Sequence, residues 1–225
     1  RDSFLICFKK GILQLLKEEI AVVLINRGVK HDLEDLDDSR FINYSLAGDY
    51  DLKKEMSLIQ TSLFHVAGNT GLDGYATIRG KNTLFVNVFL GSTFQTRLFL
   101  NKCIVLIAKL YNVFEERLVT YRDWIDRLIY MQKNGLGDGF EDYYQKEFGL
   151  IYLPHSPDEI LQGIIETLQL VEGKFSLSDE DIVNQNKFWD IYPKVWEKPG
   201  MISHKHPSNA IISPYFLRKH KNLLD

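Results

Sequence analysis

The stretch that decides the fold is Leu63-Phe-His-Val-Ala-Gly-Asn-Thr-Gly71. It is a short apolar run that ends in a glycine-rich turn, and a helical pattern over residues 72–78 follows at once. Residues 83–89 form the next strand-like run. A strand, a helix and a second strand in this order predict a parallel sheet with right-handed crossovers.

The residues before this stretch repeat the alternation. Apolar side chains recur every three or four positions over residues 5–20, which predicts an amphipathic helix. Residues 21–25 are an uninterrupted, β-branched apolar run, which is typical of a strand covered on both faces. A small strand is expected at residues 40–44, inside an acidic and solvated loop, and helical spacing returns over residues 51–62.

The residues after it are expected to be mostly helical. We predict helices over residues 94–111 and 121–132, the second behind the N-cap residue Thr120, and a short closing strand at residues 149–153. The clearest helix start follows, because Ser156 suits the N-cap, Pro157 the first helical position and Glu159 a capping box. This helix should run to about residue 171.

Two further helices are expected near the C-terminus. Ser178 with Asp181 begins one, which should end near Tyr192, and Ser213-Pro214 begins the last. Together the patterns predict an α/β protein with a Rossmann-like open parallel sheet of about five strands and helices on both faces. We expect a Rossmann-like domain over residues 1–175 and a helical C-terminal extension over residues 176–225, packed on that domain.

The composition of the chain excludes some classes of function. The 225 residues include 27 Lys and Arg against 30 Asp and Glu, so the net charge of −3 gives no general attraction to nucleic acid. Cys7 and Cys103 stand alone in apolar surroundings and are interpreted as buried thiols in a reducing compartment. No apolar stretch approaches the roughly 20 residues of a membrane span. A cytoplasmic location is therefore expected.

Ligands of an open parallel sheet bind at the carboxyl ends of its strands. The turn Gly68-Asn69-Thr70-Gly71 is the most suggestive of these ends, since two glycines permit close backbone approach, Thr70 brings a hydroxyl and the following helix favours an anion. A phosphate suits this position. An ordinary turn is about equally compatible with the same residues, because glycine is common between strands and helices for steric reasons.

Two other ends of strands carry candidate residues. Arg27 follows a strand, where its guanidinium could clamp a phosphate or carboxylate, although a plain surface arginine is equally compatible. His155 precedes the capped helix, where it could meet a sugar or base, act as an acid or base, or simply pack beside the cap. The chain has no P-loop and no Gly-x-Ser-x-Gly nucleophile elbow, so covalent hydrolysis is not expected.

The C-terminal residues are basic. Residues 194–225 hold six Lys and Arg against Glu197 and Asp225, and they include His204, His206 and His220. His204 and His206 could be half of a metal site, but no third ligand is local, so a solvated basic tail is favoured and no metal is expected. Such a tail could also contact an anionic membrane surface.

Taken in order, these pieces resemble the C-terminal portion of bacterial glycosyltransferases that are associated with surface polysaccharide synthesis and have the two-domain GT-B architecture. The stretches that carry the resemblance span most of the chain. They are residues 21–28, residues 40–45 (Arg-Phe-Ile-Asn-Tyr-Ser), residues 63–88, residues 155–166 (His-Ser-Pro-Asp-Glu-Ile…Glu) and residues 207–217. Arg1-Asp2-Ser3 is similar to the end of a His-x-Arg-Asp-Ser element of that family, which implies a preceding acceptor-binding domain.

The resemblance implies a hexosyltransferase-type enzyme whose donor, a nucleotide-diphosphate sugar, is held by this chain as a substrate without a further cofactor. Gly68, Asn69, Thr70 and Gly71 would contact the diphosphate or sugar, and His155, Ser156 and Glu159 the ribose or sugar. Arg27 would be catalytic by neutralising charge on the departing nucleotide diphosphate. The acceptor would be a glycan or a lipid-linked molecule, at or near the inner face of the membrane.

Two other classes stay open from the residues alone. One is a non-catalytic α/β module that binds a ligand or partner and shares only the fold. The other is a small phosphotransferase or hydrolase that uses Asp32, Asp49 or Asp73. Binding of a nucleotide would favour the glycosyltransferase over the non-catalytic module. A metal requirement for all binding would favour the phosphotransferase or hydrolase.

Overall fold

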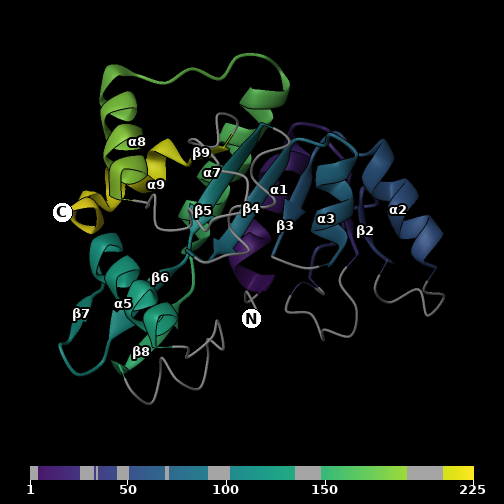
Figure 1. The fold of residues 1–225 in the computed structure, drawn as a ribbon. Coiled ribbons are helices and arrows are strands. Elements are labelled where there is room, and N and C mark those ends of the chain that lie inside the picture. Colours follow the sequence, from purple (N-terminus) through teal and green to yellow (C-terminus); the bar gives the residue numbers. More distant parts are fainter. Residues whose placement is uncertain are drawn as a thin grey trace.

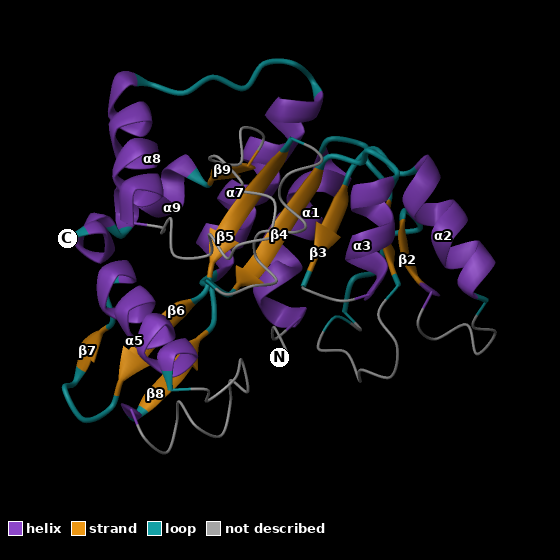
Figure 2. Cartoon of the chain, viewed as in Figure 1, coloured by secondary structure: helices purple, strands orange, loops and turns teal. Residues whose placement is uncertain are grey.

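A computed structural model describes residues 5–25, 33, 35–44, 51–68, 71–90, 102–134, 148–191 and 210–225. The protein is a mixed α/β fold with a parallel sheet at its centre (Figures 1 and 2). That sheet has the strand order β3-β4-β5-β9, formed by His65–Ala67, Thr83–Val88, Cys103–Ile107 and Ala210–Ile212. All three pairings in it are parallel, as the strand-helix-strand pattern predicts.

The inner strands of this sheet form the core. Leu84 and Ile104 lie on one face of the sheet, and Phe85 and Val105 lie on the other. All four side chains are buried, so both faces of β4 and β5 are covered. Helix α7 (Pro157–Val171) packs on β4 and β5, and α1 (Lys9–Lys17) packs on α7; Figure 1 shows both behind the sheet. Gly163 permits this close approach, because a Cβ there would lie 3.0 Å from Leu84 Cδ1.

The N-terminal elements follow the predicted alternation. The 3-10 helix η1 (Leu5–Phe8) leads into α1, and β1 (Val22–Leu24) pairs in parallel with β2 (Phe41–Asn43) in a separate two-stranded sheet. Helix α2 (Leu52–Thr61) begins behind Asp51, whose side chain accepts a hydrogen bond from the Lys53 amide. Helix α3 (Gly71–Ile78) links β3 to β4 and packs against β3 and α2.

The helix that we predict over residues 94–111 is wrong where the structure describes it. Residues 103–107 are β5, and residues 109–112 are β6 (Lys109–Asn112). The apolar run at Cys103–Ile107 is continuous, so its periodicity cannot separate a buried helix from a buried strand. Its β-branched residues Ile104, Val105 and Ile107 favour the strand, and pairing with β4 on one side and β9 on the other decides it.

A small antiparallel unit is inserted between β5 and α7. Its sheet has the order β7-β6-β8, with β7 at Arg117–Leu118 and β8 at Leu150–Leu153, and it carries helix α5 (Tyr121–Lys133). The predicted helix behind Thr120 and the predicted strand near residue 150 are therefore confirmed. That strand pairs with β6 and not with the central sheet. Figure 1 shows this unit beside one end of the sheet.

The C-terminal residues supply both helices and a strand. Helices α8 (Asp179–Ile191) and α9 (Pro214–Lys219) form where capping residues predict them, and η4 (Lys221–Leu224) follows α9. The segment predicted as a helical extension also contains β9, the edge strand of the sheet. The Gln185 amide fastens this edge, since its Nε2 donates to the Ile212 carbonyl (2.6 Å) and its Oε1 accepts from the Ile212 amide (3.1 Å).

No helix within the described residues is both long enough and apolar enough to cross a membrane.

Candidate functional site

The predicted ligand turn lies at the carboxyl end of β3. The strand ends at Ala67, Gly68 follows it, and α3 begins at Gly71, so the turn does link a parallel strand to a helix. Asn69 and Thr70 lie outside the described residues, and so does Arg27. The positions of these three predicted side chains therefore stay predictions.

Nothing in the described part of the chain requires a glycine at position 68. A Cβ there would meet no atom within 4 Å, and its φ is not among the positive values. Gly68 is also exposed. Among the described residues, neither packing nor backbone conformation explains this glycine, and a larger side chain would have room there.

A histidine–aspartate contact lies directly beside this turn. Nε2 of His65 lies 3.5 Å from Oδ1 of Asp73, which is in the first turn of α3, and Asp73 is almost completely buried. The acid already places negative charge at the end of the helix that attracts anions. The helix end therefore adds little attraction for an anionic ligand at this turn.

A second cluster surrounds Glu159 at the start of α7. Its Oε2 accepts hydrogen bonds from Lys109 Nζ at 2.9 Å and from the Ser156 amide at 2.9 Å, and it lies 3.2 Å from His155 Nδ1. Its Oε1 lies 2.6 Å from His220 Nε2 and 3.0 Å from Lys219 Nζ. We call these five side chains the Glu159 cluster: Lys109, His155, Glu159, Lys219 and His220.

The cluster joins three elements that are far apart in the sequence. Lys109 comes from β6 just beyond the carboxyl end of β5, His155 and Glu159 from the start of α7, and Lys219 and His220 from the end of α9. The capping box predicted at Ser156 is present, and Glu159 is its second member. One carboxylate thus caps a helix and ties β6 and α9 to it.

Electrostatics keep Glu159 ionised. Burial raises the pKa of its carboxyl, but hydrogen bonds from His155, His220 and Lys109 outweigh burial and hold that pKa well below its ordinary value. Burial lowers the pKa of His155, against the opposing effect of Glu159, so this ring is neutral. Because a carboxylate only accepts, the neutral ring carries its proton on Nδ1.

This geometry changes the role expected for Glu159 and His155, which was direct contact with a ligand. Glu159 has no exposed surface and both of its oxygens are bonded within the protein, and His155 is also buried. Direct contact with a ribose or sugar would require the cluster to open. Ser156 is half-buried and the Lys219 side chain is 39% exposed, so these two remain within reach of a ligand.

The sequence pattern groups His155, Ser156 and Glu159 but does not indicate the lysines or His220. Lys109 falls in the stretch predicted as a helix, and the bases near the C-terminus are predicted to form a solvated tail. The described ones are paired instead: Arg218 with Asp181, Lys219 and His220 with Glu159, and Lys221 with Glu180. The continuous apolar run at residues 103–107 is the sequence feature that could have placed Lys109 just beyond a buried strand.

A second buried carboxylate lies two turns further along α7. Oε1 of Glu166 accepts a hydrogen bond from the Tyr215 amide at 2.9 Å, at the start of α9, while its Oε2 has no partner among the described residues. Burial raises the pKa of Glu166 to about 7, although Ser213, Tyr215 and Arg218 lower it in part; Asp181 adds to the rise.

We expect Glu166→Gln to flatten the pH dependence of stability. The folded-state pKa of Glu166 lies above its unfolded value, so its contribution to stability is complete below the unfolded pKa and is lost as pH rises through about 7. Glutamine stays neutral throughout. Between about pH 5 and pH 8 the free energy of unfolding should fall by up to about 3 kcal/mol more in the wild type than in the variant.

Urea unfolding of both proteins at the two pH values checks this expectation. Asp158→Asn serves as the comparison, since that exposed carboxyl has a lowered pKa and is not among the groups that shift the pKa of Glu166. Parallel pH profiles for the wild type and Glu166→Gln would contradict it.

Aromatic rings fill the space between the end of β4 and the inserted unit. Phe89 meets Tyr152 at 4.4 Å between ring centroids and Trp124 at 6.2 Å, both edge to face. Trp124 is completely buried. This contact fixes α5 and β8 against the carboxyl edge of the sheet.

No protein-family model, curated protein or solved structure matches this chain. The described residues also contain no group of three or more His, Cys, Asp or Glu side chains that could hold a metal ion. The geometry of the carboxyl edge, together with the sequence, is therefore the basis for a functional proposal.

Proposed function

We propose that this chain is the donor-binding half of a glycosyltransferase, which moves a sugar from a nucleotide diphosphate to a glycan or lipid-linked acceptor. The observation that carries the proposal is the exposed Gly68 at the carboxyl end of a parallel strand, where no packing among the described residues requires glycine and a helix follows three residues later. The described sheet is compatible with the Rossmann-like arrangement expected for such a domain.

In this proposal the diphosphate lies along Gly68–Gly71 and Arg27 faces its charge. The bond between the sugar's anomeric carbon and the diphosphate oxygen breaks, and the acceptor hydroxyl oxygen forms the new bond to that carbon. The nucleoside diphosphate leaves with the electron pair, and a base in the acceptor-binding part takes the hydroxyl proton. Arg27 stabilises the charge that develops on the leaving group.

The Glu159 cluster has a positioning part in the same proposal. Glu159 holds Lys109 and Lys219 near the start of α7, so that Ser156 and Lys219 present polar groups toward the carboxyl edge. His155 packs edge to face on Phe216, and its Nδ1 holds the Glu159 carboxylate. These residues shape the donor site without contacting the reacting atoms.

A non-catalytic binding module is the second candidate. The observation that favours it is the internal bonding of Glu159 and His155, two of the side chains expected to meet the donor. Such a module would bind its ligand without sugar transfer. Contact with an anionic membrane surface is compatible with either proposal. Arg218, Lys219 and Lys221 are paired with acids, so such contact would rely on other basic residues.

We expect one nucleotide among UDP, GDP and CMP, or its sugar derivative, to raise the melting temperature. At a ligand concentration a hundredfold above Kd, the increase should be about 5 °C or more. Gly68→Val should abolish the increase without changing the melting temperature of the free protein, because its side chain has open space in the fold. Arg27→Ala and Thr70→Ala should each weaken nucleotide binding about tenfold or more.

Gly74→Ala is the matched control, since this glycine also has open space and lies in α3 beyond the turn. It should keep the nucleotide response and gain up to about 1 kcal/mol of helix stability. An equal response to nucleotide in the wild type and in Gly68→Val would overturn the proposed site. No response to any nucleotide would leave the binding module as the better candidate.

A further inference from the structure

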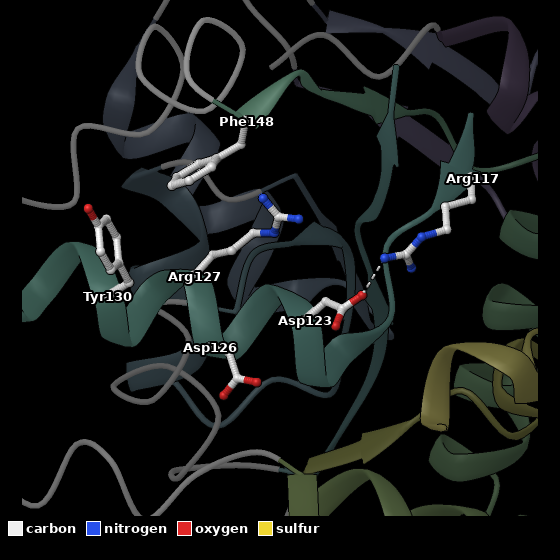
Figure 3. A pocket seen from close by; sticks show the side chains of 6 residues that line it. All are labelled: Arg117, Asp123, Asp126, Arg127, Tyr130 and Phe148. Atoms are coloured by element: carbon white, nitrogen blue, oxygen red, sulfur yellow. Dashed lines mark hydrogen bonds and ion pairs between the residues drawn. The ribbon is translucent and has the colours of Figure 1, made fainter. Parts of the chain in front are cut away.

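A hollow of about 320 Å³ lies on the inserted unit (Figure 3). Its lining includes neither Gly68 nor any member of the Glu159 cluster. Asp123, Asp126, Arg127 and Tyr130 line it from successive turns of α5. Arg117 of β7 and Phe148, two residues before β8, complete it. Its volume is at the lower end of the roughly 300–1,000 Å³ that small-molecule sites occupy.

The hollow is built from one face of α5. Its four helical residues have the spacing i, i+3, i+4 and i+7, which places them on one stripe of the helix. The buried side chains Trp124, Leu128 and Met131 hold the opposite stripe against the core. The polar stripe is therefore presented outward by a well-packed helix.

Both arginines of the hollow are held in place. Arg117 forms ion pairs with Glu115 at 2.6 Å and with Asp123 at 2.9 Å. Arg127 pairs with Glu115 at 3.3 Å, and its guanidinium lies over the Phe148 ring at 5.1 Å from the centroid. Each guanidinium has five N–H donors, so these contacts leave donors for a ligand.

The remaining groups supply acceptors and an apolar face. Asp126 makes no hydrogen bond or ion pair with the described residues, so its carboxylate oxygens are available. Tyr130 is 54% exposed, and its ring stands edge-on to Phe148 with 6.5 Å between centroids. An exposed ring on the rim of a polar hollow gives a ligand a flat apolar contact.

The charges of the hollow decide the class of ligand. The two arginines are balanced by two aspartates in the lining and by Glu115, which pairs with both arginines, so the hollow has no net positive charge. These acids repel phosphates and carboxylates. A ligand that suits it is uncharged, offers many donors and acceptors, and has an apolar side that can lie on a ring. A pyranose has all three properties, because its hydroxyls project from the ring edge and its C–H groups form the faces.

We propose that this hollow is a subsite for a neutral oligosaccharide chain, separate from the donor site. The inference rests on the proposed function in one respect, that the chain it holds is the acceptor or product of sugar transfer. Sugar binding itself does not require that role. Donor binding and oligosaccharide binding can therefore fail independently.

The test is saturation-transfer NMR on the full chain with neutral hexasaccharides of glucose, galactose, mannose and N-acetylglucosamine. At least one should receive magnetisation, with a millimolar Kd. Tyr130→Ala should weaken that binding about tenfold or more, through loss of the ring contact, and Asp126→Ala severalfold. Arg122→Ala, exposed on the same helix but outside the hollow, should leave it unchanged.

Each outcome decides the proposal. No transfer to any of the four hexasaccharides would overturn it, and so would equal binding by the wild type and Tyr130→Ala. Stronger binding of an anionic heparin hexasaccharide than of every neutral one would also overturn it. Tyr130→Ala should keep the nucleotide-dependent melting shift, which Gly68→Val loses, so failure of this subsite is distinct from failure of the donor site.

Discussion

Glu159→Ala is expected to lower the free energy of unfolding by about 3 to 5 kcal/mol. The carboxylate is completely buried, and its removal leaves Lys109, which is 9% exposed, as a buried charge without its counter-ion. Lys219 and His220 lose the contact that ties α9 to α7. Urea unfolding followed by circular dichroism measures the loss.

Two comparisons make this result specific. Asp158→Ala removes the neighbouring acid, whose pair with Lys10 at 2.8 Å is exposed, and it should change stability by less than about 1 kcal/mol. Lys109→Met with Glu159→Leu removes both members of the buried pair, and it should be less destabilising than Glu159→Ala alone. Equal effects of Glu159→Ala and Asp158→Ala would refute the central position of Glu159.

Trp124→Ala is expected to be the other large effect, with a loss of about 3 to 5 kcal/mol. The indole is completely buried between α5 and the core and meets Phe89 at the carboxyl end of β4. Its removal leaves a cavity where the inserted unit joins the parallel sheet. Thermal and urea unfolding measure the loss.

Arg122→Ala on the same helix is the control and should stay within about 0.5 kcal/mol of the wild type, because Arg122 is exposed. A loss below about 1 kcal/mol for Trp124→Ala would mean that this contact does not hold the unit. If the proposed donor site lies at this edge, the variant should also weaken nucleotide binding, whereas Arg122→Ala should not.

Elements with signals inside their own sequence were predictable. The capping box at Ser156 and the cap at Ser213 lie within three residues of the amides that they bind, so a single stretch contains the whole interaction. The turn between β3 and α3 is also local, and its glycines mark it without reference to the rest of the chain.

Elements that depend on distant partners were not predictable. Residues 103–107 form a strand because they pair with β4 and β9, and β9 lies about a hundred residues further along the chain. Three residues, Ala210–Ile212, are too few for a periodic signal. The antiparallel pairing of β6 with β8 likewise follows from the hairpin and α5 between them.

The candidate site divides in the same way. Its local members, Gly68 and the group His155, Ser156 and Glu159, stand out in the sequence because helix starts and glycine turns have fixed spacing. The partners of Glu159 do not, since Lys109 and His220 are 50 and 61 positions away from it. The hollow on α5 required the same information, because β7 and Phe148 complete it from outside the helix.

The sequence by itself determined the α/β class, the strand at residues 65–67, the helix at residues 71–78 and the capped start of α7. Only the tertiary structure decided that Glu159 is an internal counter-ion for residues of β6 and α9, and that residues 103–107 are a central strand. The physical reason is the distance along the sequence between residues that interact. Caps and turns are satisfied by neighbouring residues, whereas a buried charge and a central strand are satisfied by partners that only folding brings near.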